Sequence, residues 1–174
     1  MATLPPPPVV NDAQIAAFLE AAQQTIDDVP FCWLATRSLE GGTNARAVRS
    51  RDGGAGLAAL TRRFLVRRGS RKVAEIRAVP LVTLAYQHPS GDRYVALGGR
   101  AAILEDVAQM RALWSGEMDA QFPPGFAEAN MVVVRVEVDR VEVHVRGLTR
   151  EPFGTGRTLL ERLDDGAWRF VPDY

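Results

Sequence analysis

The sequence predicts a mainly β fold, an antiparallel barrel with about three peripheral helices. Short runs of alternating or continuous apolar residues recur along the chain and are separated by glycine- and proline-containing turns. No regular alternation of strand and helix suggests a parallel sheet. The length of 174 residues and a hydrophobic content of 47% suit one domain with a sizeable core. We therefore expect a flexible proline-rich tail at 1–10 and a single domain over 11–174.

The first half of that domain begins with a helix. Asn11 is a good N-cap with Gln14 three residues later, and apolar residues at helical spacing follow to about residue 26. Trp33 lies in a mostly apolar run and is expected in the core. Three short strands, which we expect to form a β-meander, follow at 31–36, 44–49 and 56–60, with Thr61 closing the third.

The second half begins with a short helix that Ser70 could cap and that Pro80 ends. The apolar parity of 132–145 changes at Asp139-Arg140, which requires a bulge or a tight turn, and Gly98-Gly99 marks a bend or bulge in another long strand. The remaining elements expected here are strands at 81–86 and 93–104, a helix at about 105–114, a loop at 122–125, the strand at 132–145, and a hairpin of 158–163 with 168–171.

Composition excludes several classes of function. Lysine plus arginine and aspartate plus glutamate both number 21, so we expect no nucleic-acid or membrane-surface partner. Cys32 is the only cysteine, which favours a reducing, cytoplasmic compartment. The sequence contains no long apolar run, so we expect no membrane span. His88 and His144 are far apart in the sequence, so we expect no metal site.

The chemistry-bearing residues cluster around one predicted helix start. Ser70, Arg71 and Lys72 would add a hydroxyl and two cations to free backbone N–H groups, which are the components of a phosphate site. Arg46 lies on the same strand face as Val48, where an inward arginine usually meets an anion. Thr61 can hydrogen-bond a ligand. For each feature alone the alternative is structural: a solvated basic helix start, a surface arginine or an ordinary strand end.

The order of these motifs resembles the pyridoxamine 5′-phosphate oxidase-like family over roughly residues 12–146. The segments that carry the resemblance, in order, are Leu34-Ala-Thr36, Gly41-Gly42, Arg46-Ala-Val48, Gly53-Gly54, Leu60-Thr61, Ser70-Arg-Lys72, Val79-Pro80, and Arg93-Tyr-Val-Ala-Leu-Gly98 with Gly99-Arg-Ala101. The resemblance implies a split β-barrel that binds flavin mononucleotide (FMN), and a homodimer with the flavin at the subunit interface.

The resemblance also assigns roles to residues. It implies that Arg46 contacts the flavin and its phosphate, that the backbone of Ala47 and Val48 lines the isoalloxazine, and that Thr61 reaches the ribityl-phosphate. It implies that Ser70, Arg71 and Lys72 hold the phosphate. The C-terminal segment resembles the tail of the vitamin B6 oxidases, so Trp168, with Arg157 or Arg169 beside it, is expected to reach the partner's flavin; the alternative is a tryptophan packed in its own hairpin.

The sequence departs from the vitamin B6 oxidases at two places. Tyr94 stands where those oxidases carry a flavin-contacting glutamine, and 106–125 lacks their Arg-Pro substrate-phosphate motif. The segments Ala112-Leu-Trp-Ser115 and Phe122-Pro-Pro-Gly125 resemble the general stress protein branch. We therefore expect an FMN-dependent oxidoreductase with a small-molecule electron donor, no efficient oxidation of pyridoxamine phosphate, and no identifiable catalytic residue beyond a weak candidate, Tyr94. The alternatives are a non-catalytic flavin-binding stress protein or sensor, and a relative that uses F420 or haem.

Overall fold

The computed structural model describes residues 10–50, 61–153 and 156–172, so the expected 1–10 tail and 56–60 strand lie almost entirely outside the described residues. The described elements, in chain order, are α1 (Asp12–Asp28), β1 (Phe31–Arg37), β2 (Thr43–Arg49), β3 (Thr61–Arg67), α2 (Arg71–Ala78), β4 (Leu81–Gln87), β5 (Arg93–Leu104), α3 (Val107–Leu113), α4 (Gly116–Asp119), α5 (Phe126–Asn130), β6 (Met131–Val145), β7 (Leu159–Arg162) and β8 (Trp168–Val171). Five helices therefore replace the three expected, because α4 and α5 are too short to give a helical apolar pattern.

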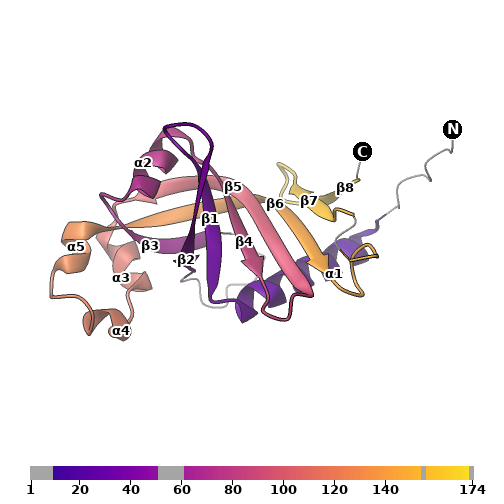
Figure 1. Ribbon diagram of the computed structural model, residues 1–174, viewed down its shortest axis with the longest axis horizontal. Helices are drawn as coiled ribbons and strands as arrows, with labels where there is room; N and C mark the ends of the chain where they lie inside the picture. Colours follow the sequence, from indigo (N-terminus) through magenta and orange to yellow (C-terminus); the bar gives the residue numbers. More distant parts are fainter. Residues whose placement is uncertain (1–9, 51–60, 154–155, 173–174) are drawn as a thin grey trace.

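The eight strands form one antiparallel sheet in the order β2-β1-β4-β5-β6-β7-β8, and β3 pairs with β6 (Figure 1). Within it, β2-β1-β4-β5-β6-β3 follow the order of a barrel wall. No ladder joins β2 to β3 among the described strands, so the sheet is open rather than closed. The predicted mainly β, split-barrel-like architecture is confirmed.

The expected pairing of the first two strands is present, whereas the expected third strand at 56–60 lies outside the described residues. β1 pairs with β2, but β3 pairs with β6 over its whole length, from Thr61 opposite Glu137 to Arg67 opposite Met131. Thr61 therefore opens a strand instead of closing one. The sequence does not predict β3, because its apolar residues Phe64, Leu65 and Val66 are flanked by arginines on both sides.

The predicted irregularity in the long strands is confirmed. β5 pairs with β6 along its whole length, from Arg93 opposite Val145 to Leu104 opposite Val133. The register shifts where Gly98 faces Arg140 and Gly99 faces Val138, which leaves Asp139 as the extra residue. A Cβ at Gly99 would lie 2.2 Å from the backbone oxygen of Glu137, so only glycine fits this close approach.

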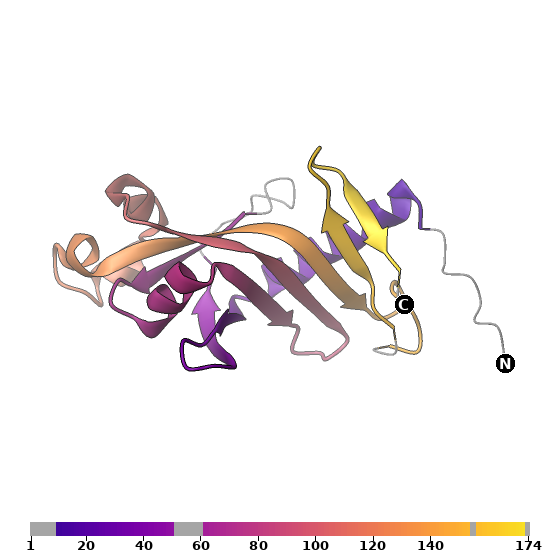
Figure 2. The same cartoon turned by 90° about the horizontal axis from the view of Figure 1, so that it is seen from above.

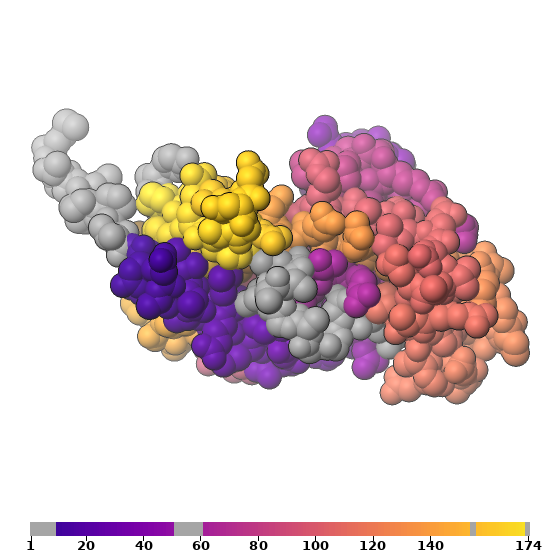
Figure 3. Space-filling view, turned by 180° about the vertical axis from the view of Figure 1, so that it is seen from behind, coloured from indigo at the N-terminus to yellow at the C-terminus, as the bar shows by residue number. Residues whose placement is uncertain are grey.

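The main core lies between the inner face of the sheet and α1. The predicted capping box of Asn11 and Gln14 is present at the start of α1, and Phe18 and Ala22 are buried beneath the helix. α1 lies beside the C-terminal hairpin β7–β8 at one end of the molecule, and α3, α4 and α5 gather at the other (Figures 2 and 3). These three helices cover a second, smaller core around Met110 and Leu113.

Candidate functional site

The predicted helix start at Ser70 is confirmed, and its hydroxyl is unusual. Ser70 occupies the N-cap of α2 with an extended backbone, but its side chain makes no capping hydrogen bond. Its Oγ is buried and has no hydrogen-bond partner among the described residues. A buried hydroxyl without a partner is costly, so this atom is a candidate for contact with a bound ligand.

Sequence reasoning missed the residue that organises this site, Glu75. Its carboxylate is completely buried on α2. Oε2 accepts hydrogen bonds from Thr36 at 2.6 Å and from Arg46 at 2.7 Å, and Oε1 accepts one from Asn44 at 2.5 Å. Burial raises the pKa of Glu75, but the hydrogen bonds from Thr36, Asn44 and Arg46 outweigh it and hold the pKa below its usual value. Glu75 is therefore an anion that ties β1, β2 and α2 together.

Glu75 also fixes the predicted ligand arginine. One terminal nitrogen of Arg46 donates to Glu75, and the other donates to the carbonyl of Leu34 at 3.3 Å and to the hydroxyl of Thr36. A guanidinium carries five N–H donors, so these three contacts leave two for a further acceptor. As predicted, Arg46 points to the same sheet face as Val48, and its side chain is 19% exposed.

The positive charges gather around Glu75. Arg71 Nε lies 3.5 Å from Glu75 Oε1, and its side chain is largely exposed. Desolvation and the nearby Arg46 guanidinium lower the pKa of Lys72, against the opposing effect of Glu75. The structure thus brings together Arg46, Ser70, Arg71 and Lys72, as the sequence predicted. Counting Arg46, Arg71 and Lys72 against Glu75, the cluster carries a net charge of +2.

The other predicted site residues lie elsewhere. Thr61 and the loop after Arg67 are at opposite ends of β3, separated by roughly 20 Å of strand. Tyr94 stacks on His144 with centroids 4.2 Å apart and contacts Phe153 edge-on at 5.8 Å, three strands from β2 in sheet order. Trp168 lies on β8, at the opposite edge of the sheet from β2, and packs on the main core.

Ala47 faces the outside of the sheet, where large apolar side chains are exposed. Trp33 and Leu81 are each 58% exposed and Phe31 is 54% exposed, so the expectation that Trp33 lies in the core is wrong. The alternation of β1 has the opposite phase, with Cys32, Leu34 and Thr36 buried. The small residues Ala35, Ala47 and Ala85 share this outer face with Trp33.

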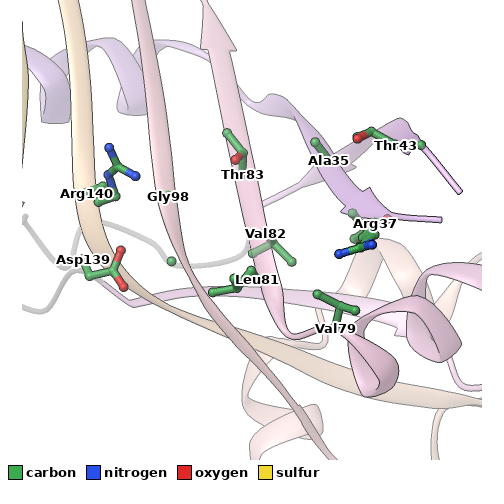
Figure 4. A pocket seen from close by; sticks show the side chains of 13 residues that line it. Ala35, Arg37, Thr43, Val79, Leu81, Val82, Thr83, Gly98, Asp139 and Arg140 are labelled. Carbon is green, nitrogen blue, oxygen red and sulfur yellow. The ribbon is translucent and has the colours of Figure 1, made fainter. Parts of the chain in front are cut away.

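A cavity of about 650 Å³ lies on the same outer face. Arg37 and Arg140 flank it, and Leu81 and Thr83 lie between them (Figure 4). The backbone of Gly98 at the β5–β6 bulge forms part of its wall. The bulge therefore shapes a hollow in a sheet face that would otherwise be flat.

Comparison with known proteins agrees with this architecture. A family model described as "Pyridoxamine 5′-phosphate oxidase like" matches residues 19–147. No curated protein sequence matches. A Clostridium acetobutylicum protein related to general stress protein 26 of Bacillus subtilis has a TM-score of 0.69 at 16% identity, with 87% of this chain and 98% of that chain covered.

Two further structures extend the range of ligands among similar folds. A Nostoc punctiforme FMN-binding protein related to pyridoxamine 5′-phosphate oxidase has a TM-score of 0.66 at 19% identity, covering 94% of this chain and 96% of that one. PhzG of Burkholderia lata, in complex with tetrahydrophenazine-1-carboxylic acid, has a TM-score of 0.64 at 16% identity, covering 98% and 97%. The matches also include an F420 reductase and a haem-binding protein of Mycobacterium smegmatis.

The structural matches named above are below 25% identity and establish the fold, whereas the family model spans well over half of the chain. The β1–β2 pair, the Ser-Arg-Lys helix start and the long bulged strands all fall inside the matched segment 19–147. The chain therefore belongs to the pyridoxamine 5′-phosphate oxidase-like family.

Proposed function

We propose that this protein binds FMN, with the flavin phosphate at the start of α2. The observation that carries the proposal is the buried, partnerless Oγ of Ser70 among the described residues, next to Arg46, Arg71 and Lys72. Three cations surround one buried carboxylate, and the pKa of Lys72 is lowered, so the cluster carries excess positive charge that a phosphate would balance. Binding a phosphate there would satisfy the hydroxyl and raise the pKa of Lys72 again.

The charge of the cluster favours a phosphate monoester. Such a group carries about −1.5 to −2 charges at pH 7. The net +2 from Arg46, Arg71, Lys72 and Glu75 balances this charge. The neutral vitamin riboflavin lacks the phosphate, so it would forgo these contacts. A compact dianion site of this kind also suits FMN better than haem.

FMN, when bound, supplies hydride or single-electron chemistry, and we propose that the protein is an oxidoreductase that uses it. The chain's own residues would bind and orient the cofactor. Arg46 would be held in one orientation by Glu75 and Thr36, while Lys72 and Ser70 would meet the phosphate directly. No acid or base is assigned, because Tyr94 is packed between His144 and Phe153, and burial together with Glu142 raises its pKa.

The working unit that we propose is a homodimer joined through the outer sheet face. Phe31, Trp33 and Leu81 expose large apolar side chains on one face of β1 and β4, with Leu81 four residues along β4 from Ala85, the partner of Trp33. Such a patch on a soluble protein usually marks an interface. A two-fold partner would cover it and the adjacent cavity, and Trp168 at the far sheet edge would then be available to the partner's flavin rather than to its own.

The absorbance spectrum of the purified full chain tests the cofactor class. We expect a flavin spectrum, either as purified or after incubation with FMN. A haem or F420 spectrum, or no uptake of FMN, would contradict the proposal. Anaerobic addition of reduced nicotinamide then tests the chemistry. We expect bleaching of the flavin, whereas a flavin that no soluble donor reduces would favour the non-catalytic binder.

A further inference from the structure

A second cavity lies outside the proposed flavin site, among the short helices at the end of the molecule. Its volume is about 450 Å³, within the usual range for small-ligand sites. It lies between α3, α4 and α5 and is lined by Trp114, Phe122 and the Pro123-Pro124 pair. The proposed flavin function uses none of these residues.

The aromatic walls of this cavity are held in place. Phe122 stacks on Phe126 with ring centroids 4.7 Å apart and an interplanar angle of 16°. Trp114 meets Phe122 at 5.8 Å and 54°, so the two rings are inclined to each other. Beneath them, Trp114 and Phe126 pack on the small core of Met110 and Leu113. The rings therefore present fixed π faces, which attract cations.

The charges that line the cavity sum to −1, from Asp119, Glu128 and Arg111. Arg111 is neutralised, because its Nε and one terminal nitrogen both donate to Glu128 Oε1, at 3.1 and 2.7 Å. Asp119 accepts the indole N–H of Trp114 at 2.7 Å and makes no ion pair with a basic residue in the described part of the chain. Its carboxylate is the one uncompensated charge of this cavity.

We propose that this cavity binds an alkylated ammonium cation. Fixed aromatic rings, prolines and a single carboxylate without an ion-pair partner among the described residues suit a bulky cation whose charge is spread over methyl groups. A small hard metal ion prefers six or more oxygen ligands, whereas this lining offers two carboxylates, one of which is paired with Arg111. An anion would meet the negative ring faces and Asp119. The inference is independent of the flavin proposal, since Glu75, Ser70 and Lys72 are not among the lining residues.

Calorimetric titration of the full chain with choline tests the proposal against 3,3-dimethyl-1-butanol, its neutral isostere. We expect choline to bind at least about tenfold more tightly, because only the cation is attracted to the rings and to Asp119. Asp119→Asn keeps an acceptor for the indole N–H and removes the charge, and we expect it to weaken choline about fivefold or more. Glu117→Gln, in the same short helix but outside the cavity lining, removes the same charge and is expected to leave binding within about twofold.

Equal binding of the two isosteres, no saturable choline binding, or equal effects of Asp119→Asn and Glu117→Gln would overturn the proposal. If Asp119→Asn lowers the melting temperature, Phe122→Leu provides the alternative test. It removes one aromatic wall and is expected to reduce the preference for choline over the alcohol. A folded Phe122→Leu variant with an unchanged preference would likewise overturn it.

Discussion

At the scale of single residues, Glu75 holds the candidate site together, because its buried carboxylate accepts hydrogen bonds from Thr36, Asn44 and Arg46. Ser70, Arg71 and Lys72 can be recognised from the sequence, because they stand at a predicted helix start and two of them are cationic. Glu75 lies four residues after Arg71, and the local pattern suggests an ordinary exposed i,i+4 pair. Its burial depends on Thr36 and Asn44, which are 39 and 31 positions earlier in the chain. Only the fold brings these partners together.

We expect Glu75→Gln to destabilise the protein without FMN by about 1–3 kcal/mol at pH 7, because it removes the charge that holds Arg46. Urea denaturation measures this effect. The pKa of Glu75 is lowered in the fold, so its contribution is complete above the unfolded-state pKa and is lost as the pH falls through the lower folded value. The difference between wild type and variant is therefore expected to shrink in acid.

Glu105→Gln is the matched control for this prediction. Glu105 also contacts two arginines, Arg68 and Arg77, but its side chain is 47% exposed. Exposed ion pairs contribute about 0–1 kcal/mol, so this variant is expected to change stability little. Equal losses in the two variants at pH 7 would contradict the central role of Glu75.

At the scale of elements, periodicity predicts the long strands well and the basic strand badly. The phase change at Asp139 predicts the bulge in the pairing of β5 with β6. β3 was missed because Arg62 and Arg63 precede its apolar core and Arg67 and Arg68 follow it. Arg62 is nevertheless buried and donates to Gln23 on α1 at 3.1 Å. A charged side chain can therefore be buried where the fold places a hydrogen-bond partner beside it.

The bulge gives a prediction for Gly99→Ala. The new methyl group would lie 2.2 Å from Glu137 O, which is backbone and cannot rotate away. We expect a loss of about 2–3 kcal/mol in the free energy of unfolding, measured by chemical denaturation. Gly69→Ala is the control, because a Cβ there meets no atom within 4 Å. A Gly99→Ala variant as stable as the control would show that the bulge is not needed.

The helices α3 to α5 give a prediction about substrate. A second phosphate needs its own cluster of cations, and Arg111, the one basic residue between Asp106 and Gly125, is already paired with Glu128. Asp106 caps α3, and Glu117 and Asp119 add further negative charge. We expect no efficient turnover of pyridoxamine phosphate by the FMN-loaded protein. A rate comparable to that of a dedicated oxidase would contradict this placement within the family.

At the scale of the whole molecule, the sequence predicted one mainly β domain but not which face of its sheet is exposed. The apolar run at Phe31–Thr36 suggested a strand buried on both sides, yet one side of β1 lies uncovered. The proposed dimer would account for this, because a face that a second copy covers has the composition of a core. Trp33 therefore gives the same signal in the sequence as a core tryptophan.

The exposed face predicts the effect of Trp33→Glu combined with Leu81→Glu. Two charges placed on the apolar patch are expected to shift the dimer to monomer at micromolar concentration, as measured by light scattering. Leu39→Glu is the control, because Leu39 is 61% exposed but lies in the β1–β2 turn, outside the strands that carry the apolar patch. A wild-type protein that is monomeric while retaining FMN would contradict the proposed assembly.

The most direct test of the central claim compares FMN with riboflavin by equilibrium titration of the wild type, Arg71→Ala, Lys72→Ala and the control Arg77→Ala, which removes a cation at the other end of α2. Because a charge-assisted contact contributes about 1.5–3 kcal/mol, we expect Lys72→Ala to weaken FMN roughly tenfold or more. Riboflavin, which has no phosphate, is expected to bind the variants and the wild type alike. Unchanged FMN affinity in folded Arg71→Ala and Lys72→Ala proteins would show that the phosphate does not bind at this helix start.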